Sequence, residues 1–266
     1  DSAQRRAHMK LIRSFCMALS LYSRLPVPRV AWEEGNMAYA LCFFPIVGAF
    51  VAFFQLAWLI LAVILGLGTV LTAAVVSLIP LAVAGGIHMD GFLDTADALG
   101  SNASRERALE IMRDPHVGAS ALIAGTAYML LAFALWSEVE TAAPALFSLL
   151  LVPVLSRALS ALAAATFKNA RGEGLLASMQ KASDARAARV ASALWILAAA
   201  GVMLWRSPLC GGAMLIAALV SFLAYRAVSY RRFGGATGDV AGWFVQVCEL
   251  ACLAAFVLAA KIGGLP

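Results

Sequence analysis

Seven long apolar segments constrain the fold of this chain more than any other feature. Together they cover more than half of its 266 residues, and most are long enough to cross a hydrocarbon core of roughly 30 Å as a helix. In lipid the backbone must satisfy its own hydrogen bonds, so only helices and closed barrels can span. Continuous rather than alternating apolar runs exclude a barrel. We therefore predict seven spanning helices, over residues 38–65, 69–87, 117–136, 143–166, 190–205, 209–227 and 240–260.

Composition supports this class. Hydrophobic residues make up 62% of the chain, against a usual share of about 45–50%, and a soluble domain could not bury so much apolar surface. We predict an all-α polytopic integral membrane protein with one domain over residues 1–266. The five cysteines are scattered and mostly lie in apolar segments, so they are read as small buried residues rather than disulfides or zinc ligands.

The first part of the chain has a different pattern. Residues 8–25 place apolar side chains on one side of a helix and add basic residues beside them. This pattern is typical of an amphipathic helix that lies in the membrane interface near anionic lipid. Pro26 and Pro28 then stop any helix.

The basic residues fix the expected orientation. Of the 20 lysines and arginines, 17 fall in alternate connecting segments if seven helices span. The positive-inside rule places these segments, and the N-terminus, in the cytoplasm, with the C-terminus outside. The net charge of +5 therefore reflects one membrane surface and predicts no nucleic-acid partner. The four basic segments are the N-terminal segment with Arg5 to Arg29, the motif loop with Arg105 to Arg113, the loop over residues 167–189 and the segment over residues 226–239.

Three acids directly follow the second apolar segment. Asp90, Asp94 and Asp97 are spaced i, i+4 and i+7, which places them within roughly 60° of one helix face. Such carboxylates repel one another unless a cation or protons intervene, and oxygen ligands favour Mg²⁺. A solvated acidic helix face is the alternative, but acids beside a membrane span tend to be functional. We predict a Mg²⁺ site, completed by Asp114 or Asp239.

A glycine-rich turn precedes the last apolar segment. Gly234, Gly235 and Thr237 stand just before Asp239 at an expected helix start, where backbone N–H groups can bind an anion. An ordinary loop turn is the alternative. Ser104 is the expected N-cap of a short helix that runs through Arg113.

Arg157 and Glu249 are charged residues inside apolar segments. Both lie nine or ten residues from the expected cytoplasmic ends, about 15 Å deep at 1.5 Å per residue. A contact between them would lower the cost of burying each charge, and a purely structural ion pair is the alternative. His88 could serve as a base or donate a hydrogen bond to a phosphate. The alternative is a histidine at the membrane interface with no such role.

Several longer motifs carry a family resemblance. The blocks that carry it are residues 23–28, 44–48, 85–97, 109–114, 156–157, 170–175 and 234–239. With these residues the chain resembles the cobalamin synthase family, the adenosylcobinamide-GDP ribazoletransferases, which are integral membrane enzymes. The acidic block is highly specific, and the order of the blocks along the chain is more so.

The resemblance implies a reaction. Adenosylcobinamide-GDP and α-ribazole, or its 5′-phosphate, would give adenosylcobalamin, or its 5′-phosphate, and GMP. The expected enzyme is a Mg²⁺-dependent phosphotransferase of the bacterial inner membrane, with its active site facing the cytoplasm. We leave open whether it forms a homo-oligomer. The residues assigned to substrate binding are Arg157, Lys168, Arg171, Glu173, Gly234, Gly235, Thr237 and Glu249, and those assigned to catalysis are Asp90, Asp94 and His88.

Two other classes are weighed against this one. A CDP-alcohol phosphotransferase or an aromatic prenyltransferase would also use acids at a membrane, but their aspartate motifs are not present as such. A transporter could use Arg157 and Glu249 as a midplane coupling site. Against a transporter, the acids lie at one face and no internal repeat is found.

Overall fold

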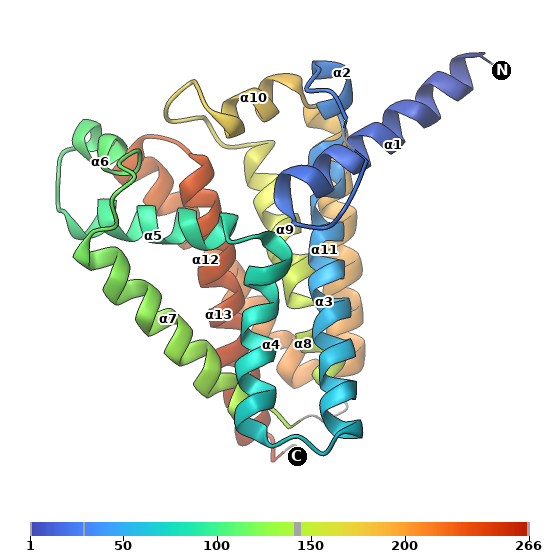
Figure 1. Cartoon of the computed structure of the whole chain (residues 1–266), viewed down its shortest axis with the longest axis vertical. Coiled ribbons are helices and arrows are strands. Elements are labelled where there is room, and N and C mark those ends of the chain that lie inside the picture. Colours follow the sequence, from blue (N-terminus) through green and yellow to red (C-terminus); the bar gives the residue numbers. More distant parts are fainter. Residues whose placement is uncertain (1, 29, 141–144, 265–266) are drawn as a thin grey trace.

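Helices form nearly all of the structure. The computed structural model describes residues 2–28, 30–140 and 145–264 (Figure 1). In chain order the helices are α1 (Ser2–Tyr22), α2 (Glu34–Met37), α3 (Ala40–Ile64), α4 (Thr69–Ala84), α5 (Ile87–Gly100), α6 (Arg105–Ile111), α7 (Ala119–Ser137), α8 (Leu146–Leu149), α9 (Val152–Ala164), α10 (Leu175–Ala182), α11 (Ala185–Arg206), α12 (Pro208–Val228), the π-helical turn η1 (Ser229–Phe233) and α13 (Gly238–Ile262).

The prediction of an all-α polytopic membrane protein is confirmed. Six helices in the described part of the chain are long and apolar enough to cross a membrane: α3, α7, α8 with α9, α11, α12 with η1, and α13. A seventh span is reached only if α4 and α5 are counted together, although the two meet at an angle of 94°. Each of the seven expected segments contains a helix, although residues 143 and 144 of the fourth lie outside the described residues, and the second is built differently from the others.

The bend between α4 and α5 corrects the expected span over residues 69–87. The spanning helix ends at Ala84, and Gly85 and Gly86 follow with φ values of +64° and +81°. Glycine adopts this left-handed conformation without the steric cost that a Cβ brings. The acidic motif thus lies on a separate helix, α5, which crosses the end of the bundle rather than running along it (Figure 1). Gly91, within the motif, lies inside α5.

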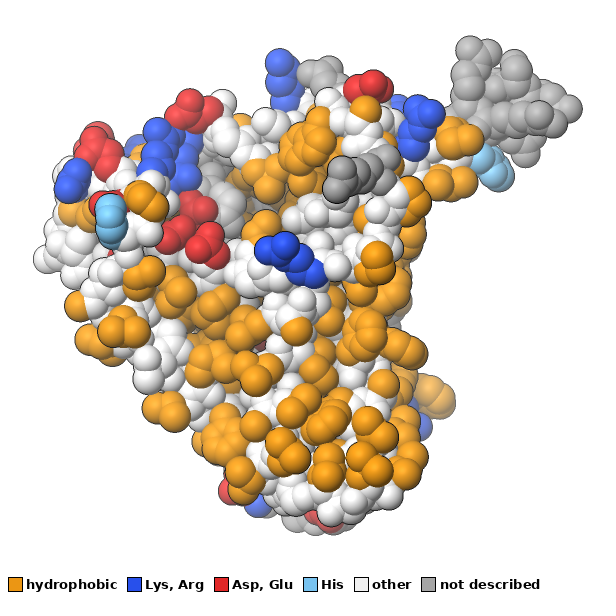
Figure 2. Space-filling view, in the orientation of Figure 1, with side chains coloured by type: hydrophobic (Ala, Val, Ile, Leu, Met, Phe, Trp, Pro, Cys, Tyr) orange, Lys and Arg blue, Asp and Glu red, His pale blue; other side chains and the backbone are white. Residues whose placement is uncertain are grey.

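The two ends of the bundle differ in charge. Helices α1, α2, α5, α6 and α10 gather at one end, and the C-terminus lies near the other (Figure 1). Charged side chains cluster around α5, α6 and α10, while hydrophobic side chains cover the flanks (Figure 2). The basic segments therefore lie at one end of the bundle, as expected if they are alternate connections between spanning helices. Which side of the membrane this end faces stays a prediction.

Helix α9 forms the centre of the bundle. Over residues 146–164, 78% of the positions are buried, a larger share than in the other spanning helices. Small residues such as Ala158, Ala161 and Ala163 are fully buried there, which lets neighbouring helices approach closely. The predicted N-terminal helix exists as α1. It packs on the charged end of the bundle, where Met17, Ala18 and Leu19 are buried.

Candidate active site

The acidic helix α5 packs directly on the start of α13, and glycine makes this contact possible. A Cβ at Gly91 would lie 2.7 Å from the backbone oxygen of Asp239, and a Cβ at Gly242 would lie 2.9 Å from the backbone oxygen of His88. Both distances are shorter than ordinary contacts. The absence of side chains at these two positions therefore lets the backbones touch, and this brings the acids of α5 beside Asp239.

Three carboxylates and one guanidinium meet at this crossing. Asp94 lies close enough to Asp90 and Asp239 for their negative charges to act on its carboxyl group. Burial, followed by these charges, raises the pKa of Asp94 to about 7. Arg171 contacts Asp239, with 2.9 Å between Nη1 and Oδ2. The structure thus brings together four of the predicted site residues: Asp90, Asp94, Asp239 and Arg171.

Asp97 has a different partner from the one we predicted. Its carboxylate accepts hydrogen bonds from the backbone nitrogens of Gly118 and Ala121, at 2.5 and 2.8 Å. These are free N–H groups at the start of α7, and a carboxylate that accepts them stabilises the helix and its dipole. The i, i+4, i+7 face is therefore real, but its third acid is occupied by a neighbouring helix.

Asp114 lies in an exposed turn after α6. Its side chain accepts hydrogen bonds from the backbone nitrogen and the ring Nδ1 of His116. These bonds hold the pKa of Asp114 below its usual value. No contact in the described residues joins it to Asp90 or Asp94, so Asp239, and not Asp114, is the acid that the fold brings to the motif.

The donor set suits a hard divalent cation. Negative charges that raise the pKa of Asp94 would be offset by a cation, and carboxylate oxygens are the ligands that Mg²⁺ prefers. No three acids or histidines in the described part of the chain are already placed to enclose a metal. Mg²⁺ usually binds through one or two carboxylates together with substrate phosphates and water. One or two of Asp90, Asp94 and Asp239 could hold the ion in this mode, with water and a substrate phosphate as the remaining ligands.

The glycine-rich turn and the loop after α9 are joined by backbone hydrogen bonds. The nitrogen of Ala236 donates to the oxygen of Lys168 at 2.7 Å, and the nitrogen of Ala170 donates to the oxygen of Ala236 at 3.0 Å. A Cβ at Gly235 would lie 2.5 Å from the Lys168 oxygen, so glycine is required there. The Lys168 side chain is exposed and does not line the site cavity.

Gly234 and Thr237 complete the turn. Gly234 has a φ of +70°, and the guanidinium of Arg105 lies against the position that a Cβ would take. The Thr237 hydroxyl accepts a hydrogen bond from the nitrogen of Val240 at 3.1 Å and so caps α13. The turn therefore directs the start of α13 and Asp239 towards α5.

A cavity of about 200 Å³ opens at this crossing. Its charged side contains Asp90, Arg171, Glu173 and Asp239, and Thr237 also lines it. Glu173 also forms an ion pair with Arg113, which holds the loop over residues 171–174 near α6. The structure thus places these predicted residues of the catalytic and binding sets around a single space.

His88 lines the same cavity. Its side chain is buried, and Nε2 has no hydrogen-bond partner among the described residues. Burial, followed by the nearby charge of Arg157, lowers the pKa of His88 well below its ordinary value. One ring nitrogen, Nε2, is therefore free to face a bound molecule.

Arg157 and Glu249 form the predicted pair. Nη1 of Arg157 and Oε1 of Glu249 are 2.5 Å apart, and the two side chains are only 1% and 10% exposed. Ser156 donates a further hydrogen bond to the same carboxylate oxygen at 2.8 Å. Neither charged residue lines the site cavity. The contact is confirmed, and the geometry favours a structural ion pair beneath the site over direct substrate binding.

Some site residues were missed by sequence reasoning. Arg105 was counted only as a loop charge, although it lies against Gly234. Asn169 was noted only as part of a polar loop, although its side-chain oxygen accepts hydrogen bonds from the nitrogens of Arg171 and Gly172. Tyr22 and Phe44 line the cavity but read as ordinary apolar residues. Only their neighbours in space distinguish them.

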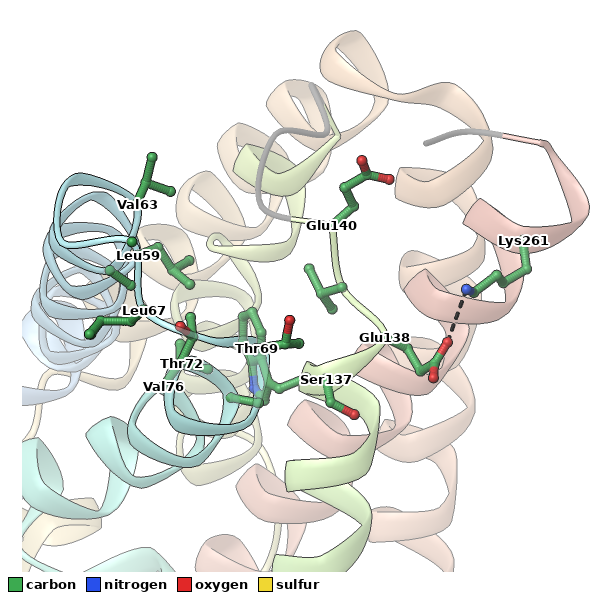
Figure 3. Close-up of a pocket in the computed structure, with 15 residues that line it drawn as sticks. Leu59, Val63, Leu67, Thr69, Thr72, Val76, Ser137, Glu138, Glu140 and Lys261 are labelled. Atoms are coloured by element: carbon green, nitrogen blue, oxygen red, sulfur yellow. Dashed lines mark ion pairs between the residues drawn. The ribbon is translucent and has the colours of Figure 1, made fainter.

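A larger cavity, of about 380 Å³, lies at the opposite end of the bundle (Figure 3). It is lined by the ends of α3, α4, α7 and α13, and Lys261 and Glu138 form an exposed ion pair at its edge, 2.9 Å apart. None of the predicted site residues reaches it. Volume alone therefore does not identify the site, and the chemistry favours the smaller cavity at α5.

The fold and the site define a class of polytopic α-helical membrane protein with an acid-lined cavity at one end of the bundle. The family model described as cobalamin-5-phosphate synthase matches residues 14–257. The chain belongs to this family, which confirms the resemblance inferred from its motifs.

Named relatives agree with this assignment. The adenosylcobinamide-GDP ribazoletransferase of Lachnoclostridium phytofermentans is 40% identical over 251 residues, which cover 94% of this chain and 95% of that protein. The protein of the same name from Azorhizobium caulinodans is 36% identical over 272 residues, which cover 96% and 98%. No solved structure matches the chain.

Proposed function

We propose that this protein is an adenosylcobinamide-GDP ribazoletransferase. It would join α-ribazole, or its 5′-phosphate, to adenosylcobinamide-GDP and give adenosylcobalamin, or its 5′-phosphate, and GMP. The observation that carries the proposal is that Asp90, Asp239 and Arg171 line one cavity, with Asp94 close enough for the charges of Asp90 and Asp239 to raise its pKa, in a chain whose relatives bear this name.

The proposed chemistry is a displacement at phosphorus. A hydroxyl oxygen of the ribazole attacks the phosphorus bonded to the cobinamide side of the pyrophosphate. A new P–O bond forms, the bond from that phosphorus to the bridging oxygen breaks, and GMP leaves with the bridging oxygen. Asp90 or Asp94 accepts the hydroxyl proton, and the unpartnered Nε2 of His88 is left to contact a substrate.

The remaining site residues would bind and orient the phosphates. Arg171 is near enough to the acids to contact a phosphate bound between them, and Arg105 stands against the glycine-rich turn. Mg²⁺, held by one or two of Asp90, Asp94 and Asp239, would offset the negative charge that develops on the transferred phosphate. The ion pair between Arg157 and Glu249 would stabilise the packing of α9 against α13 beneath the cavity.

The proposal includes a location. Because most basic residues fall in the segments at the α5 end, this end should face the cytoplasm of the bacterial inner membrane, where nucleotide substrates are found. The C-terminus would then lie outside.

The test uses purified protein in lipid nanodiscs. GMP and the corrinoid product should appear in equal amounts, and only when adenosylcobinamide-GDP and α-ribazole are both present. Asp90→Ala should abolish turnover, whereas Glu138→Gln, which changes an acid at the opposite end of the bundle, should not. Release of GDP instead of GMP would show that the bond between carbon and oxygen breaks, and would refute displacement at phosphorus.

A further inference from the structure

The site cavity has an apolar end that the proposed phosphate chemistry does not use. Besides the charged residues, Tyr22, Leu41, Phe44, Ile87 and Leu176 line it, and these five residues are called its apolar end. These residues come from α1, α3, α5 and α10. Phosphates and carboxylates gain nothing from such a surface, because burying a charge without a partner is costly. The apolar end must therefore contact a different part of a substrate.

Aromatic rings form the wall of this end. The ring centroids of Tyr22 and Phe44 are 4.2 Å apart, and the planes meet at 37°. The ring of His88 lies 5.7 Å from that of Phe44. Phe44 is only 4% exposed and packs with Leu19 and Val47, so its position is set by the core. A flat, largely apolar ring system is the ligand that such a wall recognises by stacking.

The polar groups at this end select among flat rings. His88 Nε2 is buried and unpartnered, and it offers one hydrogen-bonding position. The fused bicyclic base of α-ribazole carries only ring nitrogens, so one polar partner is enough. The guanine of the GDP moiety carries several donors and acceptors, and some of them would stay unsatisfied here at a cost of about 1–3 kcal/mol each.

The volume of the cavity excludes the corrin macrocycle as its occupant. It is about 200 Å³, which is below the roughly 300–1,000 Å³ of pockets that enclose drug-sized ligands. A bicyclic base fits this space, whereas the corrin macrocycle is far larger than a drug-sized ligand. The corrinoid must therefore stay outside the cavity, with only its pyrophosphate reaching the acids.

We propose that the apolar end, with the rings of Tyr22 and Phe44 and the neighbouring His88, binds the base of α-ribazole and so determines which lower base is accepted. This rests on the proposed function. The base lies against the aromatic wall, and the ribose extends towards Asp90 and Asp239 on the charged side. Tyr22 is the last residue of α1, so the N-terminal helix is part of the binding site as well as a membrane-surface element.

The proposal is tested with Phe44→Leu and Tyr22→Leu in nanodiscs, with Phe54→Leu as the matched control. Phe54 lies on α3 with Phe44, but it is 38% exposed and outside the cavity. Each site variant should raise KM for α-ribazole about 3- to 10-fold. KM for adenosylcobinamide-GDP should not change, and the control should behave as the unaltered protein. Thermal unfolding of each variant shows whether it is folded.

Direct binding gives a second readout that does not need turnover. Free benzimidazole should bind the unaltered protein and bind the two site variants more weakly by a similar factor, measured by its fluorescence. A rise in KM for adenosylcobinamide-GDP alone would place guanine at the apolar end and overturn the proposal. Unchanged KM values in folded, active variants would overturn it too. If the unaltered protein formed no product, the proposed function itself would fail.

Discussion

Replacing Gly91 with alanine should separate α5 from α13 and weaken the site. A Cβ at this position would lie 2.7 Å from the Asp239 oxygen, whereas ordinary contact begins near 3.4 Å. The difference between these values means that the backbones must move apart by about 0.7 Å. The obstacle is helical backbone, which cannot rotate away as a side chain can. Overpacking of this kind costs about 1–3 kcal/mol.

The same movement displaces Asp90 and Asp94 from Asp239. A misplacement of about 1 Å at reacting groups can cost roughly 100-fold in rate, so Gly91→Ala should lower kcat/KM by about 10- to 100-fold. The assay is GMP release in nanodiscs, run beside thermal unfolding in detergent. Alanine is otherwise the better helix former by about 1 kcal/mol, so any loss must come from the crossing and not from helix propensity.

Two further variants give a graded series. Gly242→Ala meets the His88 oxygen at 2.9 Å and should cause a smaller loss, while Gly201→Ala has no atom within 4 Å and should cause none. Full activity and unchanged stability of Gly91→Ala would refute the reasoning, because the close approach would then not hold the acids together.

Four other predictions concern the buried ion pair, the cap of α7, the metal ion and the topology. Removing only Arg157 or only Glu249 should lower the free energy of unfolding by about 3–5 kcal/mol, and a double-mutant cycle with additive effects would contradict the contact. Asp97→Ala should cost about 0.5–2 kcal/mol of stability, as loss of a helix cap does. Loss of activity at unchanged stability would instead support a role at the metal. A chelator should stop GMP release and added Mg²⁺ should restore it, and Asp94→Asn should need a higher Mg²⁺ concentration than the unaltered protein. Activity that persists in the chelator would show that the reaction does not need the ion. A reporter enzyme that works only outside the cytoplasm should be active when fused to the C-terminus. Activity of a fused reporter that works only in the cytoplasm would overturn the seven-span topology.

Sequence patterns were sufficient where neighbours along the chain make the structure. Continuous apolar runs predicted the spanning helices, because a chain in lipid must bond its own backbone. Ser104 was correctly expected as a helix cap, and its Oγ accepts from the nitrogen of Arg107. Equal depths predicted the contact between Arg157 and Glu249, since two opposite charges inside a membrane have few other partners.

Patterns along the chain were insufficient where several residues could do the same thing. The bend could have fallen at any glycine near the motif, and it falls at Gly85 and Gly86 because both adopt positive φ. Asp97 shares a face with Asp90 and Asp94, but the start of α7 packs against it and takes its oxygens. A periodicity shows which side chains point the same way, and it does not show which helix will face them.

What the sequence by itself determined is thus the class of protein, the helices and the residue types available for chemistry, because hydrophobicity, helical period and charge are local properties. Only the tertiary structure decided which of those residues form the site. Asp239 joins the acids of α5 from more than 140 positions away because Gly91 and Gly242 let two backbones touch. Tyr22 and Phe44 become part of the cavity because α1 packs on α3. Such contacts depend on the shapes of surfaces far apart in the chain, and no local pattern encodes those shapes.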